Sequence, residues 1–259
     1  MRATASRLTG SFRVGADFFA RQGLVVTDGA APRGVVDRVA DLANAAVDTA
    51  RIDPALVPFF EETSALDLRI RSRWRFPFSI GWRLARVVAR WIGQLVLPRH
   101  EARIRTEAFA IDAARDGRAD VRAIVRTYAD TGEVFQAMAY ATWERGGTRY
   151  MSAAFPLPFG CLMGLLRLDA IARDGDVVRA VALTSAAQDG DDAGVWLTLG
   201  RIAIPLPLGE RLELWAPGTE GAPDEPPPEG APPATILGRH VQTCFGVRVV
   251  THHYWFCPS

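Results

Sequence analysis

A histidine and two acidic residues in the last third of the chain are the residues best suited to acid–base chemistry. Asp192, Glu210 and His240 carry groups that exchange protons readily when a fold brings them together. A different interpretation of Asp192 is a turn, Asp191-Asp192-Ala193-Gly194, in which the side chain bonds its own backbone. Glu210 has the alternative of an ion pair with a nearby arginine. These alternatives stay open at the level of sequence.

The other histidines do not form a metal-binding pattern. His252 and His253 are adjacent, so in a strand they point to opposite faces and only one enters any given pocket. A metal centre would need His100 or His240 and a carboxylate from elsewhere, which nothing in the spacing requires. Ser185 has no G-x-S-x-G elbow around it, so a serine hydrolase has little support. We therefore predict neither a metal site nor a cofactor.

A row of arginines lies in a segment of strict alternation at 66–75. Arg71 and Arg73 share the charged face of this predicted strand, where guanidinium groups could bind carboxylate or phosphate. The favoured alternative is the solvated face of an edge strand, whose charge discourages aggregation. The residues predicted to bind a ligand are Arg71, Arg73, Trp74, Asp192, Glu210, His240, His253 and Tyr254.

Composition excludes several classes of function. All 30 basic residues are arginine, so Schiff-base chemistry and a Walker P-loop, which both need lysine, are excluded. A net charge of +1 gives no general attraction to nucleic acid. Three cysteines without C-x-x-C spacing predict reduced thiols and a cytoplasmic location. We expect no secretory leader and no membrane-spanning segment, which leaves peripheral membrane contact open; oligomeric state is not predicted.

Alternating apolar and polar residues from 101 to 215 predict consecutive antiparallel strands, because loops as short as Asp116-Gly117 or Gly146-Gly147 cannot connect parallel neighbours. The predicted strands are 102–112, 120–129, 133–144, 148–156, 161–172, 176–186, 194–204, 209–215, 235–245 and 247–256. The expected fold class is α+β, mainly β: a large curved antiparallel sheet, half-barrel or barrel-like, packed on an amphipathic helix, with N-terminal helices.

Three helices are predicted. One begins at Pro32 and carries apolar residues from Val35 to Val47, and a shorter one begins at Pro54. The third, 78–96, has a broad apolar face; packing of that face on the sheet is favoured over a membrane interface or a partner. The predicted organisation is a loosely ordered segment 1–31, a helical extension 32–58, and a β domain 59–259 that contains a Pro-rich loop at 216–234.

Several segments resemble one family. The segments 149–159 (RYMSAAFPLPF), 164–168 (GLLRL), 183–185 (LTS), 192–197 (DAGVWL) and 205–210 (PLPLGE) are similar to the soluble C-terminal domain of YndJ-type proteins. The resemblance runs from about Phe59 to Phe256, with His240 and Tyr254 at matching places. It implies one folded unit and no assigned activity. The chain is expected to lack the membrane-spanning segments attached to that domain, so membrane integration is not carried over.

Three functions are compatible with these features. The favoured one is binding of a lipophilic small molecule in an apolar cavity enclosed by the curved sheet. The second is a cofactor-independent enzyme, such as a hydrolase, isomerase or cyclase, that uses His240 with Glu210 or Asp192. The third is a protein-interaction domain that uses the Pro-rich loop or the arginine row. A structure that shows which ionisable groups line a cavity would separate them.

Overall fold

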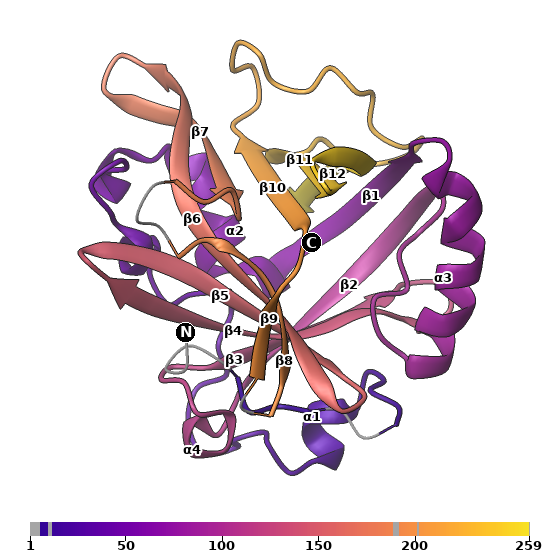
Figure 1. The fold of residues 1–259 in the computed structure, drawn as a ribbon. Coiled ribbons are helices and arrows are strands. Elements are labelled where there is room, and N and C mark those ends of the chain that lie inside the picture. Colours follow the sequence, from indigo (N-terminus) through magenta and orange to yellow (C-terminus); the bar gives the residue numbers. More distant parts are fainter. Residues whose placement is uncertain (1–5, 10–11, 189–191, 201, 259) are drawn as a thin grey trace.

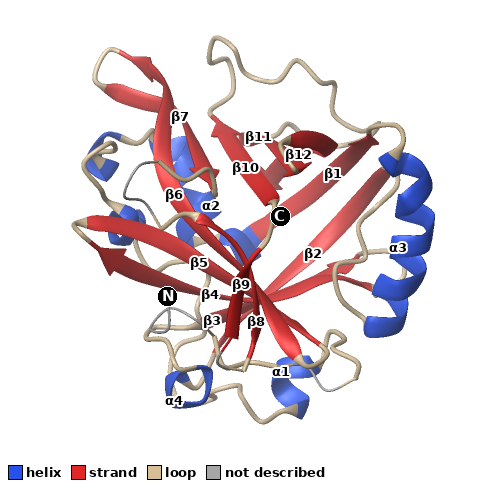
Figure 2. Ribbon diagram, viewed as in Figure 1, coloured by secondary structure: helices blue, strands red, loops and turns tan. Residues whose placement is uncertain are grey.

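The computed structural model describes residues 6–9, 12–188, 192–200 and 202–258. Strands make up most of the ordered elements (Figure 2). They are β1 (Leu66–Trp74), β2 (Glu101–Ala110), β3 (Arg122–Tyr128), β4 (Val134–Arg145), β5 (Thr148–Leu157), β6 (Gly160–Asp174), β7 (Val177–Thr184), β8 (Gly194–Leu199), β9 (Ile202–Pro205), β10 (Leu208–Trp215), β11 (Ile236–Cys244) and β12 (Val247–Pro258).

Ten of these strands close into an antiparallel barrel. Their order is β5-β4-β3-β2-β1-β12-β11-β10-β7-β6, and β6 pairs back with β5 to complete the ring. The predicted mainly antiparallel, barrel-like fold is confirmed. β8 and β9 form a hairpin beside the first half of β6, where one strand was predicted over 194–204. That prediction is wrong because Gly200 adopts a positive φ of 59° and reverses the chain; Arg201 lies outside the described residues.

The two ends of the barrel differ. At one end lie the end of β1, the start of β2, and the turns that join β3 to β4, β5 to β6 and β11 to β12. Helix α3 (Phe78–Ile92) follows β1 at this end, and it stands at the right of Figure 1. We call this the α3 end.

The opposite end is closed by the segment that precedes β1. Leu42, Leu56, Phe59 and Phe60 are buried there and pack with interior residues of the strands. The ring of Phe59 meets that of Phe256 on β12 edge to face, 5.3 Å between centroids. This segment includes α2 (Val57–Glu61) and short 3-10 turns at Val39–Leu42, Thr49–Arg51, Pro54–Leu56 and Thr63–Ala65.

The prediction of a helix from Pro32 to Val47 is wrong. Only the 3-10 turn Val39–Leu42 forms there. The reason is close packing on the end of α2. Val36 donates its N–H to the Phe60 carbonyl at 3.1 Å, and a Cβ on Gly34 would stand 2.1 Å from that same oxygen. Backbone pairing between two segments replaces the hydrogen bonds of a helix.

A second apolar cluster lies outside the barrel wall. Phe18 and Phe19 of α1 (Phe18–Arg21) are buried against small outward-facing residues such as Ala123 and Ala139.

Within the segment 1–31, which was predicted to be loosely ordered, residues 1–5, 10 and 11 lie outside the described residues. The packing of Phe18 and Phe19 was not predicted, and the division into domains stays a prediction. The short helix α4 (Ala113–Asp116) completes the elements.

Helix α3 faces the other way from the expected orientation. Trp82 is buried and donates its Nε1–H to the Leu97 carbonyl at 3.2 Å, so this side contacts the barrel. The broad apolar stripe instead faces outward, and it consists of Ile80, Leu84, Val87, Val88 and Trp91. The prediction that this stripe packs on the sheet is therefore wrong. Within the described residues, no helix is both long and apolar enough to cross a bilayer.

Candidate functional site

The barrel holds a cavity of about 230 Å³ close to the α3 end. Most of its wall is apolar: Leu95, Leu97, Phe135, Phe155, Leu162, Val195, Leu208 and Val249. Polar side chains converge on one side, namely Glu210, His240, Gln242, Thr243, His252 and Tyr254, with Gln136 from β4. This combination of an apolar wall and a few converging polar groups is typical of small-molecule sites.

A short loop after α3 forms one side of the cavity. Gly93 ends the helix in the left-handed conformation, with φ of 69°. The buried amide of Gln94 then donates to the carbonyls of Ala137 (2.6 Å) and Pro156 (3.2 Å) and accepts from the Ala137 N–H (2.9 Å). The Tyr128 hydroxyl donates to the Val96 carbonyl at 2.5 Å. These bonds fix the loop 93–98 across the barrel, so that Leu95 and Leu97 face the cavity.

Three neighbouring strands bring an acid, a base and a phenol into line. The His240 Nε2 on β11 lies 3.3 Å from the Glu210 Oε2 on β10, without the alignment of a hydrogen bond. The other ring nitrogen, Nδ1, lies 3.3 Å from the Tyr254 hydroxyl on β12. An imidazole between a carboxylate and a phenol can take up a proton that Glu210 stabilises. The arrangement therefore has the parts of a general acid–base system.

Two glycines make room for this row. A Cβ on Gly164 would stand 2.7 Å from the Glu210 Oε1, and a Cβ on Gly238 would stand 3.0 Å from the Tyr254 Cβ. Gly164 lies on β6 and Gly238 pairs directly with Tyr254 across β11 and β12. The missing side chains thus decide where the carboxylate and the phenol sit.

A second histidine lies beside the row. The His252 Nδ1 stands 2.7 Å from the Ser72 Oγ, and its ring centroid is 5.9 Å from that of His240. Burial, followed by repulsion from His240, lowers the pKa of His252 well below its ordinary value. His252 is therefore neutral at pH 7. Its Nε2 has no hydrogen-bond partner among the described residues and is free for a bound molecule.

Burial also acts on the phenols of the interior. It raises the pKa of Tyr140 to about 12 and raises the pKa of Tyr254 as well, so both hydroxyls stay protonated donors at neutral pH. Arg126 on β3 opposes these shifts because its positive charge lies near both phenols. This arginine is 7% exposed, and its Nε has no hydrogen-bond partner among the described residues. The interior thus holds the buried cation of Arg126 as well as the Glu210 carboxyl.

Of the residues predicted to bind a ligand, the structure brings Glu210, His240 and Tyr254 together. It does not bring Asp192 to His240. Both carboxylate oxygens of Asp192 lie 2.8 Å from the Arg145 Nη1, and the Asp192 N–H is donated to the Tyr150 hydroxyl. Asp191, in the alternative turn, lies outside the described residues.

The arginine row is engaged within the chain. β1 pairs with β2 and β12, so it is not the edge strand that the solvated interpretation assumed. Arg71 and Arg73 donate to the Glu225 carboxylate of the Pro-rich loop at 2.8 and 2.7 Å. This loop arches over the top of the molecule in Figure 1. Trp74 donates to the Pro98 carbonyl at 3.1 Å, and its ring lies 6.4 Å from that of His252.

His253 points away from the cavity. It lies on the outer face of β12 next to Trp255, whereas His252 shares the inner face with Tyr254. The two-residue repeat of a strand could have identified His252, because residues 252 and 254 must face the same side. Ser72 follows the same rule, since it alternates in step with the buried Leu68 and Ile70. Arg126 and Gln136 gave no sequence signal, because a buried arginine or glutamine resembles a surface one.

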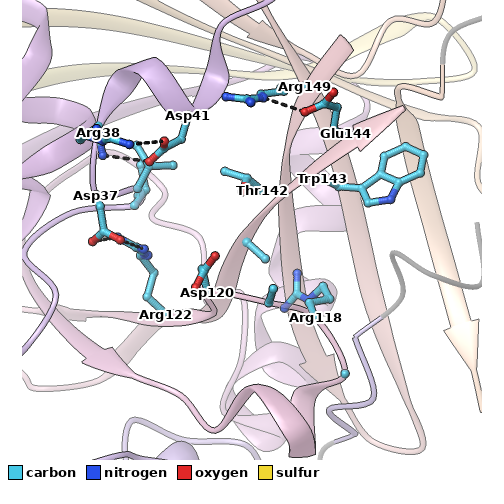
Figure 3. Close-up of a pocket in the computed structure, with 15 residues that line it drawn as sticks. Asp37, Arg38, Asp41, Arg118, Asp120, Arg122, Thr142, Trp143, Glu144 and Arg149 are labelled. Carbon is cyan, nitrogen blue, oxygen red and sulfur yellow. Dashed lines mark hydrogen bonds and ion pairs between the residues drawn. The ribbon is translucent and has the colours of Figure 1, made fainter. Parts of the chain in front are cut away.

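A larger groove of about 750 Å³ lies on the outside, near the end opposite α3 (Figure 3). Several of its charged residues pair with one another. Arg122 binds both oxygens of Asp37 at 2.8 and 2.9 Å, and Arg149 binds Glu144 at 2.9 Å. Because these charges are mutually neutralised, the groove offers a ligand less than the barrel cavity does. Among the described residues, no three His, Cys, Asp or Glu side chains could hold a metal ion.

Fold and cavity together define an antiparallel β-barrel with ionisable groups inside it. The chain is similar to the Bacillus subtilis (strain 168) protein named "Uncharacterized membrane protein YndJ": 24% of residues are identical over 97% of this chain. The chain spans 42% of that protein's length. The match supports the resemblance to YndJ-type proteins; a soluble C-terminal domain and a cytoplasmic location stay predictions. No protein-family model and no solved structure matches the chain.

Proposed function

We propose that the barrel binds a lipophilic small molecule whose polar end faces His240, Glu210 and Tyr254. The observation that carries this proposal is the internal cavity, with apolar residues on most of its wall and ionisable groups on one side. An apolar molecule that enters it leaves water and gains contact with the leucine and phenylalanine side chains. The polar end gains hydrogen bonds from groups that are otherwise poorly paired, such as the His252 Nε2.

Cavity size limits the ligand. The cavity volume is about 230 Å³. Sites for drug-sized ligands are larger, typically about 300–1,000 Å³. The cavity therefore suits a small apolar molecule, or one end of a longer chain whose remainder passes the loop 93–98. A membrane is a source of such lipophilic molecules, and the Bacillus relative is named a membrane protein.

Native mass spectrometry after incubation with a bacterial lipid extract tests the binding. We expect a species heavier than the bare protein by the mass of the ligand. Leu97→Trp replaces an aliphatic side chain of the cavity wall with a bulky indole ring, which should fill the cavity and abolish the added mass. The matched control Leu199→Trp changes an exposed leucine of β8 and should retain it. Bare protein alone in the unmodified sample would overturn the proposal.

A second candidate function is acid–base catalysis on the bound molecule, and the row Glu210–His240–Tyr254 favours it. His240 would accept a proton from the ligand while the Glu210 carboxylate stabilises the imidazolium. Tyr254 would donate a hydrogen bond to an oxygen of the ligand. The test compares the lipid extract before and after incubation with the protein and with His240→Gln. A compound consumed by the protein and left intact by the variant supports catalysis, and an unchanged extract refutes it.

A further inference from the structure

We propose that the α3 end of the barrel docks on the surface of a lipid bilayer that contains anionic phospholipids, with α3 lying in the interface. This inference goes beyond ligand binding and does not depend on the occupancy of the cavity. It rests on exposed apolar side chains, on two unusual turns and on the distribution of arginines.

The outer face of α3 is a continuous apolar stripe. Ile80, Leu84, Val87 and Trp91 recur at intervals of four, three and four residues, which places them on one side of the helix. All are exposed; Leu84 is 72% and Trp91 61% exposed. The Phe12 ring packs edge to face on Trp91, 4.4 Å between centroids, and extends the stripe past the helix end. Contiguous apolar patches of this kind mark sites of contact with a membrane or a partner.

Two turns at the same end expose a phenylalanine. Phe159 in the turn between β5 and β6 is 76% exposed, and Phe245 in the turn between β11 and β12 is 79% exposed. Both adopt a positive φ, 65° and 49°, where glycine or asparagine is favoured. Neither the turn conformation nor packing within the chain explains a large aromatic residue there. Insertion of the ring into an apolar phase does explain it.

The exposed large apolar residues are concentrated at this end. Phe76 stands exposed between β1 and α3, Val247 begins β12, and Ile202 lies at the tip of the β8–β9 hairpin. Among the described residues, the exceptions are Val26 and Val177, which lie near the other end. Separate side chains on several loop tips suit a fluid phase better than a partner with a fixed shape.

The charges near the stripe favour an anionic surface. Helix α3 contains three arginines and no acidic residue. Arg86 and Arg90 pair with Glu133, but Arg75, Arg83 and Arg99 have no acidic partner among the described residues. Arginines that flank an apolar stripe with tryptophan at its end are typical of helices that lie in the interface of an anionic bilayer. We therefore assign the surface to a bilayer rather than to a second copy of the chain.

Docking in this orientation would place the cavity next to the lipid. The loop 93–98 continues directly from α3, and its Leu95 and Leu97 form part of the cavity wall. A molecule leaving the bilayer would meet this loop first. The helix that carries the exposed stripe therefore continues directly into a loop that forms part of the cavity wall.

Co-sedimentation of the full chain with vesicles tests the inference. Vesicles of phosphatidylcholine alone are compared with vesicles in which a third of the lipid is phosphatidylglycerol. We expect binding to the anionic vesicles that falls in high salt, because screening weakens the arginine attraction. The variant Leu84→Glu/Trp91→Glu should weaken binding by about tenfold or more, since it places two carboxylates in the apolar interface. The control Val177→Glu changes an exposed valine at the other end and should bind as the unmodified chain does.

Three outcomes would overturn the docking proposal. They are no binding to anionic vesicles, binding that the double variant leaves unchanged, and a dimer in sizing chromatography that the double variant dissociates. The last would show that a second copy covers the stripe. Native mass spectrometry of the double variant with lipid extract keeps the two proposals apart. A retained ligand with lost vesicle binding supports docking and leaves the cavity function intact.

Discussion

His240 and Glu210 lie on adjacent strands, with the imidazole Nε2 3.3 Å from the carboxylate Oε2. The two residues are not direct register partners, because His240 pairs with Leu212 and Glu210 pairs with Gln242. Their side chains meet diagonally across β10 and β11. The space for this contact comes from Gly164, whose missing side chain leaves the carboxylate free to stand over β6.

The two glycines beside the row should respond differently to alanine. In Gly238→Ala, the new methyl group meets the Tyr254 Cβ at 3.0 Å, where neither backbone can withdraw, so we expect a loss of about 1–3 kcal/mol in the free energy of unfolding. In Gly164→Ala, the methyl group meets only the mobile end of Glu210, so the loss should be smaller. Urea denaturation measures both. Gly81→Ala on exposed α3 is the control and should stabilise by about 0.5–1 kcal/mol; equal losses at Gly164 and Gly238 would contradict the argument.

His252 should make the protein less stable in acid. Its pKa is lowered in the folded state, so the unfolded chain binds a proton more readily between the two pKa values. The free energy of unfolding should therefore fall as the pH drops below about 6.5, by up to about 1.4 kcal/mol per pH unit for this histidine. Urea denaturation at pH 7.5 and 5.5 should show a shallower pH dependence in His252→Asn. Identical slopes in the variant and the unmodified chain would refute this assignment.

Glu225 should hold the Pro-rich loop against β1. Burial opposes its ionisation, but hydrogen bonds from Arg71 and Arg73 prevail and lower the pKa of Glu225. In Glu225→Gln, limited proteolysis should cut faster within the Pro-rich loop 216–234. The free energy of unfolding should change by less than about 1 kcal/mol, since the pair is partly solvated. Glu229→Gln, in the same loop and exposed, is the control; equal cleavage rates in both variants would show that Glu225 does not anchor the loop.

The buried pair Arg118–Asp116 should contribute more to stability than any surface pair. Arg118 binds Asp116 through Nε at 2.6 Å and also reaches the carbonyls of Ser152 and Ala139. Arg118→Met would leave a buried, uncompensated carboxylate, so we expect a loss of about 3–5 kcal/mol in the free energy of unfolding. Arg149→Gln, which removes an exposed pair with Glu144, should cost less than about 1 kcal/mol in the same measurement. A loss at Arg118 no greater than that at Arg149 would contradict the prediction.

The strands could be predicted from the sequence because alternation and short turns are local properties. Closure of the ring could not, because it depends on the pairing of β1 with β12 and of β7 with β10, strands that do not follow one another in the chain and whose contact no local pattern records. The amphipathic pattern of α3 predicted the helix but not the side that faces water. A wide apolar face is compatible with either orientation, and contacts made by Trp82 decide it. The contact of His240 with Glu210 likewise depends on the register between β10 and β11, which the sequence alone does not determine.

Ring closure also has a consequence for how this protein associates through its backbone. Each barrel strand is paired over at least part of its length with a neighbour on both sides, so the terminal strand of the sheet in the described part of the chain is β9. All four of its residues are exposed, and Pro205 removes one donor from its free edge. Among the described residues, strand addition by another polypeptide at the end of the sheet would therefore meet only a four-residue template.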